Sequence, residues 1–370
     1  MTLDDALRSL VQVGGSDLHI KVGAPLMLRH KGDLLPSDIP PLSTSEVQEM
    51  LYAVLTENQR HRLETERELD FSRDLENVAR FRGNIFFQRG VPGAVFRAIP
   101  TVIPSLDCLT MPKVIKEFAD SEQGLILVTG PTGSGKSTTL AAVVNEINEN
   151  HYKHILTIED PIEFVHHDKN CTINQREVGS DTLSFAEALR RGLRQDPDVI
   201  LVGEMRDQET IRIAITAAET GHLVLSTLHT NDAKQSIDRV INSFPPEEHH
   251  QLRMKLSLCL LAVISQRLIK RIDGQGRVVA QEIMINSPTI KKLIESGRIG
   301  AIDKAIEESS TYYNMQSMNQ CLFALWREKL IDENEALAVS NNPNDLRLKL
   351  KTAAHAKKIQ VPAEACKDIK

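Results

Sequence analysis

The stretch GLILVTGPTGSGKSTT, residues 124–139, passes from an apolar run through a glycine-rich loop into a helical pattern. The loop matches the pattern GxxxxGK[ST] in full. Its fixed positions are Gly130, Gly135, Lys136 and Ser137. Glycines let backbone N–H groups surround phosphates, and the following helix adds the positive end of its dipole. A glycine-rich turn without a ligand is the alternative, but both flanks have the form that a phosphate loop needs. The stretch therefore predicts a phosphate-binding site on an α/β core.

The whole loop is expected to hold a nucleotide. Its residues are Gly130, Pro131, Thr132, Gly133, Ser134, Gly135, Lys136, Ser137 and Thr138. In this motif Lys136 reaches the β- and γ-phosphates, and the hydroxyl of Ser137 binds Mg²⁺. The expected ligands are therefore ATP and Mg²⁺.

Four apolar runs in this part of the chain predict a sheet. They are GLILVTG (124–130), HILTIED (154–160), DVILVGE (198–204) and HLVLSTLHT (222–230). Near-continuous apolar strands separated by helical segments are typical of a parallel sheet covered on both faces. We expect this α/β core to span residues 113–290. A helical region over 291–350 and a flexible tail over 351–370 follow it.

The first hundred residues show a different pattern. RFRGNIFFQRGVPGAVFRAI (80–99) alternates apolar and polar residues between glycine turns, as an antiparallel sheet does. STSEVQEMLYAVLTENQRHRLE (43–64) indicates helix. Three prolines between 100 and 112 keep the backbone extended. We therefore expect one domain over 1–99 and an interdomain linker over 100–112.

Composition narrows the possible partners and compartment. The net charge of −6 argues against nucleic acid as the main partner. Five scattered cysteines without a CxxC pair indicate a reducing compartment and give no support to a zinc site. The run LSLCLLAVIS (256–265) is about half as long as a membrane span, so we expect a buried helix there. A cytoplasmic protein without a transmembrane segment is expected.

Acidic side chains follow two of the predicted strands. TIEDPIEF (157–164) brings Glu159, Asp160 and Glu163, and Glu204 follows the run VILVG. A phosphate-loop hydrolase needs one acid near the metal and one polar group that orients or deprotonates water. Strand-end acids are also common as helix caps or loop charges, so the residues alone leave both sites open.

Two histidines flank the fourth predicted strand. His222 precedes it, and His229 follows it. A lone histidine is more often a hydrogen-bonded structural group than a catalytic one. His229, however, is expected at the carboxyl end of its strand, where open α/β sheets bind ligands. This position is suited to sensing a γ-phosphate.

The segments GPTGSGKSTT, TIEDPIE, RQDPDVILVGEMRD and TGHLVLSTLHTN occur in the order and spacing of the Walker A, Asp, Walker B and His boxes of one family. The chain resembles the secretion-superfamily ATPases of type II secretion and type IV pili over residues 1 to about 350. The resemblance implies a PAS-like N-terminal α+β domain, joined by a linker to a RecA-like ATPase domain with a helical C-terminal region. It also implies that Glu163 is the catalytic glutamate. In this family the Walker B strand ends in Gly-Glu, here Gly203 and Glu204, and Glu204 serves the metal site together with Ser137.

The same resemblance gives four arginines a role. On the residues alone, arginines on a solvated antiparallel face are solubilising. Family members are similar in forming hexameric rings, in which arginines of the N-terminal domain reach the bound ATP. The matching positions are Arg82 and Arg97, and Arg190 and Arg194 match two further arginines beside the site. A guanidinium against the γ-phosphate neutralises transition-state charge. We therefore expect a homohexamer.

Within the family, the compact chain is similar to the pilus retraction ATPases of the PilT/PilU group. The resemblance implies pilus retraction and twitching motility. The implied partners are an inner-membrane platform protein and paralogous pilus ATPases, and the implied location is the cytoplasmic side of the inner membrane at the pilus base. The segment LIESGRIGAIDKAIEES (293–309) is only loosely similar to the Ala-Ile-Arg-Ala-Gly-Glu pattern of this group. Whether the chain is the principal motor or the accessory paralogue therefore stays open, although the regular phosphate loop favours the principal motor.

Three other functions remain to be weighed against a retraction motor. They are a pilus or secretion assembly ATPase, an ATP-binding regulatory subunit of the ring without turnover, and a nucleic-acid translocase. The presence of Lys136, Glu163 and Glu204 favours an enzyme over the regulatory subunit. The acidic net charge disfavours the translocase.

Overall fold

A computed structural model describes residues 1–100, 102–274 and 276–359 of the chain. The chain folds into two compact units. The first unit comprises Met1–Ile103, Asp160–His167 and Glu177–Asp181, and the second comprises Pro104–Glu159, Asp168–Arg176 and Thr182–Lys370. The segment that carries Glu163 therefore groups with the N-terminal residues.

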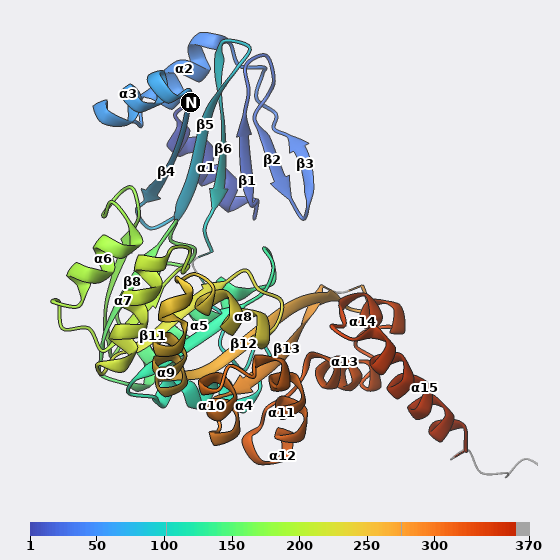
Figure 1. The fold of residues 1–370 in the computed structure, drawn as a ribbon. Coiled ribbons are helices and arrows are strands. Elements are labelled where there is room, and N and C mark those ends of the chain that lie inside the picture. Colours follow the sequence, from blue (N-terminus) through green and yellow to red (C-terminus); the bar gives the residue numbers. More distant parts are fainter. Residues whose placement is uncertain (101, 275, 360–370) are drawn as a thin grey trace, which may run out of the picture. The chain divides into compact units, whose positions relative to one another are not determined.

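The first unit is an antiparallel sheet with helices on one face (Figure 1). Its elements are α1 (Leu3–Gln12), β1 (Asp17–Ile20), β2 (Met27–His30), β3 (Asp33–Pro36), α2 (Thr44–Tyr52), α3 (Glu57–Glu66), β4 (Glu68–Leu75), β5 (Ala79–Gln88) and β6 (Val91–Ala98). The strand order is β3-β2-β1-β6-β5-β4. All three helices begin with a capping box, in which a Thr or Ser side chain and the side chain three residues later satisfy the free N–H groups.

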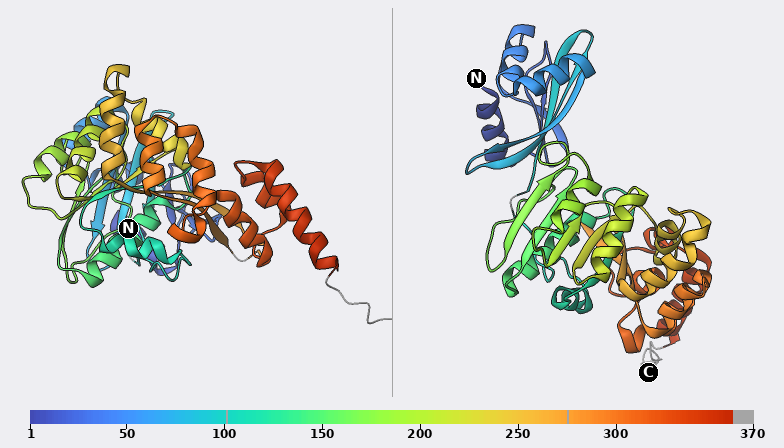
Figure 2. Two further views of the ribbon diagram at one scale, coloured as in Figure 1. Left: turned by 60° about the horizontal axis from the view of Figure 1, so that its bottom comes forward. Right: turned by 60° about the vertical axis from the view of Figure 1, so that its left-hand side comes forward.

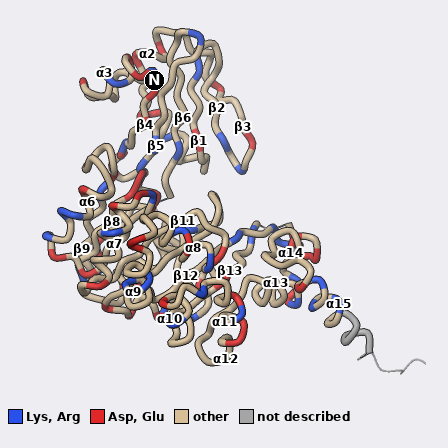
Figure 3. Tube along the Cα trace, in the orientation of Figure 1, with Lys and Arg blue, Asp and Glu red and all other residues tan. Residues whose placement is uncertain are grey.

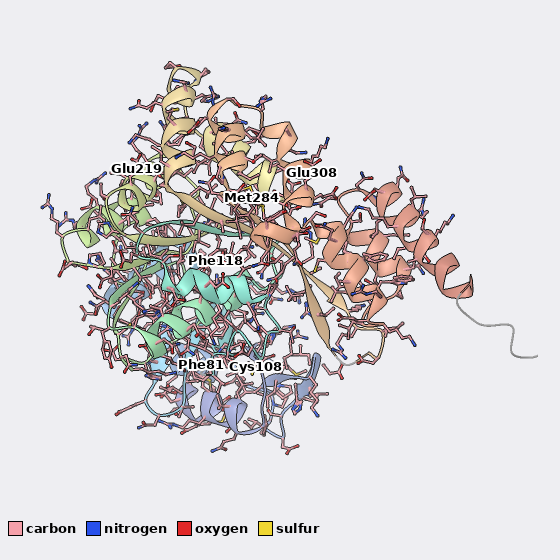
Figure 4. All side chains as sticks on the ribbon, turned by 90° about the horizontal axis from the view of Figure 1, so that it is seen from below. Phe81, Cys108, Phe118, Glu219, Met284 and Glu308 are labelled. Carbon is pink, nitrogen blue, oxygen red and sulfur yellow. The ribbon has the colours of Figure 1, made fainter. Side chains whose placement is uncertain are left out.

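Alternate residues of these strands build the core of the first unit. Leu69, Phe81 and Phe96 point to the helices and are buried, and Figure 4 labels Phe81. Their neighbours in sequence point to the other face, as the period of a strand requires. Arg82 and Arg97 lie on that other face, because they flank the buried phenylalanines.

The second unit is built around a seven-stranded sheet of order β13-β12-β7-β11-β10-β8-β9. Its elements before residue 260 are α4 (Lys113–Glu117), η1 (Phe118–Asp120), β7 (Gly124–Thr129), α5 (Lys136–Asn150), β8 (His154–Glu159), β9 (Thr172–Glu177), α6 (Phe185–Gly192), β10 (Val199–Val202), α7 (Gln208–Glu219), β11 (Leu223–Leu228), α8 (Ala233–Ile241), η2 (Pro246–Glu248) and α9 (His249–Cys259). Those after it are β12 (Leu260–Lys270), β13 (Arg277–Ile285), α10 (Pro288–Glu295), η3 (Ile299–Ala301), α11 (Ile302–Glu308), α12 (Ser310–Tyr313), α13 (Met318–Arg327), α14 (Glu333–Val339) and α15 (Pro343–Ile359). The strands β8, β10, β11, β7 and β12 run parallel, and β13 returns antiparallel to β12.

Helices cover both faces of this sheet (Figure 2). Helices α4 and α5 pack on one face, where Phe118, Val144 and Ile147 meet alternate strand residues such as Ile126 and Val128. Helices α6 to α10 lie on the other face. All six residues of β7 are buried, because both of its faces are covered.

The run at 256–265 does not form the single buried helix that we expected. Helix α9 ends at Cys259, and strand β12 begins at Leu260. The β-branched Val263 and Ile264 lie in the sheet, where β12 pairs with β7 on one side and β13 on the other. Backbone pairing on both sides outweighs a helical continuation. Among the described residues, no helix combines the length and the apolar character that crossing a membrane requires.

The C-terminal helices pack against the β12–β13 hairpin. Residues from both strands and from α13, α14 and α15 form a separate small core, which includes Ile269, Ala280, Leu322, Ala336 and Leu350. Of the tail expected over 351–370, residues 351–359 continue α15, and residues 360–370 lie outside the described residues. Within the expected linker, the chain from Pro104 groups with the second unit, and Leu106 is part of its core.

Candidate nucleotide-binding site

The phosphate loop connects the carboxyl end of β7 to the first turn of α5. Gly130, Gly133 and Gly135 have φ angles of 144°, 77° and 91°, which side-chain-bearing residues rarely adopt. A β-carbon at Gly130 would lie 2.5 Å from the carbonyl oxygen of Gln266 and 2.5 Å from Oγ of Ser134. Both the backbone angle and the available space therefore require glycine at this position. The loop leaves the first N–H groups of α5 without helical partners.

Lys136 is the first residue of α5, and its side chain folds back over the loop. Its Nζ donates hydrogen bonds to the carbonyl oxygens of Gly130, at 2.9 Å, and Pro131, at 3.1 Å. Burial lowers the pKa of the Lys136 ammonium, while the nearby Glu204 carboxylate raises it and Arg267 lowers it further. A buried ammonium that rests on neutral carbonyl groups is well placed to receive an anion.

Ser134 supplies a second feature that fits a phosphate chain. The residue is 3% exposed, and its Oγ has no hydrogen-bond partner within the described part of the chain. An unpaired buried hydroxyl costs free energy, and a phosphate oxygen would give it an acceptor. Ser137, in the first turn of α5, is exposed and can reach a metal bound beside those phosphates. The residues present therefore fit a nucleotide with its Mg²⁺ ion.

A cavity of about 380 Å³ adjoins the loop within the second unit. Its wall on the loop side consists of Ser134, Gly135, Thr138 and Thr139. Its other residues are Cys108, Leu109, Thr110, Met111, Leu268, Arg271, Arg277, Val278 and Val279. A largely apolar wall with a few polar groups is the usual form of a small-molecule site. This cavity is suited to the base and ribose of the nucleotide.

Glu204 and His229 lie at the edge of the sheet that carries the loop. Glu204 follows the carboxyl end of β10, and His229 follows that of β11, the strand between β10 and β7. Oε2 of Glu204 lies 2.8 Å from Nε of Arg206 and 3.5 Å from Nε2 of His229. The carboxyl ends of parallel strands meet at one edge, so the acid, the histidine and the loop share it.

The remaining predicted residues of the second unit have local partners or lie on its surface. His222 lies at the opposite, amino end of β11, and its Nδ1 is 3.0 Å from the carbonyl oxygen of Ala217. Arg190 forms ion pairs with Glu187 and Glu209. Arg194 is exposed just after α6. His222 is therefore a structural group, whereas the two arginines are on the surface.

Arg82 and Arg97 lie directly opposite each other on β5 and β6 of the first unit. The same cross-strand row continues to Asp17 on β1 and Arg29 on β2. Nε of Arg97 donates a 2.8 Å hydrogen bond to Asp17, yet 70% of the Arg97 side chain is exposed. Burial raises the pKa of Asp17, but hydrogen bonds from Ser16 and Arg97 hold it below its usual value.

The structure thus divides the predicted site residues between the units. Lys136, Ser137, Glu204 and His229 belong to the second unit, together with Arg190 and Arg194. Glu163 belongs to the first unit with Arg82 and Arg97. In Figure 3, basic and acidic residues are interspersed along the described trace of both units, so each unit carries both signs of charge.

Sequence reasoning missed Arg267 beside the loop. Its guanidinium donates to the carbonyl and side-chain oxygens of Asn231, just after His229, and its charge acts on Lys136. Arg267 lies on β12, and part of that strand was expected to be helix, so its faces could not be assigned. The stretch SQRLIKR (265–271) does not alternate apolar and polar residues, so no periodic signal pointed to Arg267.

Comparison with known proteins places the chain in a family. Residues 109–359 match the family described as type II/IV secretion system protein, and the chain belongs to this family. It is 49% identical to the type IV pilus retraction ATPase PilT of Pseudomonas aeruginosa, over 93% of this chain and all of that protein. It is 41% identical to the type IV pilus ATPase PilU of the same organism, over 96% of this chain and 93% of that protein.

A solved structure agrees with these relatives. A crystal structure of the pilus retraction motor PilT with bound ADP superposes with a TM-score of 0.88 at 43% identity, covering 94% of this chain and 99% of that one. The predicted fold class is confirmed: an N-terminal α+β domain and an ATPase domain with a helical C-terminal region. The predicted function, an ATPase of the pilus-retraction kind, is also confirmed by these comparisons.

Proposed function

We propose that the chain hydrolyses ATP as a homohexameric motor at the cytoplasmic side of the inner membrane and drives type IV pilus retraction there. The observation that supports it best is the loop itself, in which the buried Lys136 ammonium and the unpaired Ser134 hydroxyl can both donate hydrogen bonds to phosphate oxygens. The partners proposed with it are the inner-membrane platform protein and paralogous pilus ATPases. We also propose the domain limits 1–99, 113–290 and 291–350, with the linker 100–112 between the first two.

Each site residue has a proposed task. Lys136 neutralises the β- and γ-phosphates, Glu163 orients and deprotonates the attacking water, and His229 senses the γ-phosphate. Ser137 and Glu204 hold Mg²⁺, which would spread and neutralise charge on the phosphates when bound. Four arginines (Arg82, Arg97, Arg190 and Arg194) add positive charge around the transferred phosphoryl group.

Steady-state phosphate release by the purified protein tests the enzymatic part. Turnover that requires Mg²⁺ and disappears in Glu163→Gln supports a motor. Tight ATP binding without turnover would instead identify a regulatory subunit of the ring. Turnover that rises on addition of DNA would identify a translocase.

Deletion of the gene tests the direction of the work. Cells with surplus pili that do not retract would support a retraction motor, and cells without pili would identify an assembly motor. The higher identity to PilT than to PilU, 49% against 41%, supports the principal motor over the accessory paralogue. Complementation of a PilT deletion by this chain alone would test that choice.

A further inference from the structure

Glu177 forms a buried junction within the first unit. The residue is 3% exposed, and its carboxylate accepts hydrogen bonds from three different elements of that unit. Its Oε1 accepts from Oγ of Ser72 at 2.6 Å, and its Oε2 accepts from Nη2 of Arg80 at 2.9 Å and from the backbone N–H of Ile162 at 3.1 Å. Ser72 and Arg80 belong to β4 and β5, so one carboxylate ties the sheet to the segment Asp160–His167.

The junction is charged and specific. Burial alone raises the pKa of Glu177, but hydrogen bonds from Ser72 and Ile162 and the charge of Arg80 outweigh it and hold the pKa below its usual value. The carboxylate is therefore ionised at neutral pH and accepts hydrogen bonds from Ser72, Arg80 and Ile162. Arg80 is itself fixed, because its Nη1 donates to Asp74 at 2.7 Å. A buried ion pair with several hydrogen bonds has one preferred geometry.

The donor Ile162 directly precedes Glu163. Its side chain is also buried, at 4% exposure, so both its backbone and its side chain are held. The direction of the following side chain depends on the backbone at Ile162, and a misplacement of about 1 Å at a reacting group can cost about a hundredfold in rate. All three contacts lie within the first unit, so the route from Glu177 to Glu163 runs through the backbone of Ile162.

We propose that Glu177 is a positioning residue for ATP hydrolysis, which anchors the backbone of Ile162, and thereby Glu163, to the β4–β5 face of the first unit. This inference rests on the proposed role of Glu163 as the water-activating acid. It implies that the orientation of this acid is fixed by the first unit, although the acid follows β8 of the second unit in sequence.

Two substitutions at Glu177 test the anchor in the full-length protein. Glu177→Ala removes the acceptor of Ile162, and we expect kcat to fall about tenfold or more while KM for ATP and the Kd for nucleotide stay within about twofold. Glu177→Gln keeps an oxygen for Arg80 and Ile162 and turns its amide toward Ser72, so it should recover much of kcat. Hydrogen exchange over residues 160–167 should be faster in the alanine variant and near wild type in the glutamine variant.

A matched pair of arginines provides the control. Arg80→Gln removes the charge that holds Glu177, so it should lower kcat and speed exchange over 160–167. Arg73→Gln breaks an ion pair of the same sheet, with Asp4 of α1, and should change neither quantity. This pair decides the matter if Glu177→Ala does not fold.

The possible outcomes separate this inference from the proposed function. If Glu163→Gln hydrolyses ATP normally, the assignment of the water-activating acid fails. If Glu163→Gln is inactive while Glu177→Ala and Arg80→Gln keep wild-type kcat and exchange, the anchor is refuted and the proposed function stands. If Glu177→Gln is as inactive as Glu177→Ala with unchanged exchange, Glu177 acts by its charge, and the positioning role is wrong.

Discussion

At the scale of single residues, Lys136 shows how the loop is prepared for an anion. Its ammonium lies 2.9 Å and 3.1 Å from two loop carbonyl groups, which are partners without a compensating negative charge. Phosphate oxygens would supply that charge. Because the site is already buried, their attraction to the ammonium is screened less than at the surface.

The first prediction concerns this lysine. Lys136→Ala removes the charge that faces the phosphates, so we expect nucleotide affinity to fall strongly and turnover to drop below about a tenth of wild type. Lys153→Ala is the matched control, since Lys153 also donates from Nζ to a backbone carbonyl, that of Ser121. Fluorescent-nucleotide binding and phosphate release check both variants. Turnover above that level in Lys136→Ala would contradict the loop assignment.

The surroundings of Gly203 explain why the acid of the Walker B box does not directly follow the apolar residues of β10. Its N–H donates to the carbonyl oxygen of Ile158 on the neighbouring β8, at 2.8 Å. A β-carbon at Gly203 would lie 3.2 Å from that oxygen and 3.3 Å from Cα of Glu159. The two backbones therefore leave little room for a side chain, and the acid follows one residue later, as Glu204.

The second prediction follows from this crowding. Gly203→Ala should lower the free energy of unfolding by about 1–3 kcal/mol, because β8 and β10 must separate slightly. Gly300→Ala is the control, because a β-carbon there would meet no atom within 4 Å. Gly221→Ala would not serve, since its φ of 111° would strain any side chain. Thermal unfolding of the two variants checks it. An unchanged melting temperature in Gly203→Ala would mean that packing does not exclude a side chain there.

At the scale of elements, Glu282 on β13 joins two helices. Its Oε1 accepts the N–H of Ala233 in the first turn of α8, at 2.8 Å, and the carboxyl group also accepts from the backbone of Met318, the first residue of α13. Burial raises the pKa of Glu282 to about 7, and the carboxylates of Asp232 and Asp303 raise it too, although the two backbone donors oppose this. One carboxyl group thus accepts hydrogen bonds from the first turn of α8, the helix after His229, and from the first residue of α13.

The third prediction is a pH dependence. The folded-state pKa of Glu282, about 7, exceeds its ordinary value of 4.5, so the folded protein binds this proton more tightly than the unfolded chain. The stability contributed by the proton is therefore complete below about pH 4.5 and is lost as the pH rises through 7, on the order of 3 kcal/mol in all. The amide of Glu282→Gln does not ionise, so this variant does not lose that stability as the pH rises.

Chemical denaturation at pH 5.5 and pH 8 measures this effect. The free energy of unfolding of Glu282→Gln minus that of the wild type should be larger, and the variant thus relatively more stable, at pH 8 than at pH 5.5. The charges of Lys234, Arg267 and the other neighbours are common to both proteins and cancel in the difference. A difference that does not change with pH would show that Glu282 is not held protonated in the folded protein.

The elements also show what a sequence can predict. The loop and the four strands β7, β8, β10 and β11 were predictable, because their apolar runs and glycines are local signals. The β12–β13 hairpin was not, since α9 passes into β12 without a turn residue. The Glu177 junction was not predictable either: Ser72 and Glu177 are 105 positions apart, and no local pattern reports such a contact. The roles of the individual site residues stay predictions.

At the scale of the whole molecule, the proposed ring must bring together residues that each chain holds in two units. Arg97 is anchored by Asp17 but keeps 70% of its side chain exposed, and Arg82 lies opposite it on the same face. A guanidinium that is held at one edge and open on the other can receive an anion. We expect these two arginines to act on a nucleotide of a neighbouring subunit in the ring.

The fourth prediction tests this sharing by mixing two inactive variants, Arg97→Ala and Glu163→Gln. If Arg97 acts on the nucleotide of a neighbouring subunit while Glu163 acts on the nucleotide of its own chain, a junction is complete when a Glu163→Gln subunit supplies Arg97 and an Arg97→Ala subunit supplies Glu163. Random assembly at equal amounts should complete about a quarter of the junctions, so turnover should return in part and peak near that ratio. If the arginine acts within its own chain, no junction is complete at any ratio. Mixtures that co-assemble, as shown by differently tagged subunits, yet stay inactive at every ratio would rule out a site that takes Arg97 and Glu163 from different subunits.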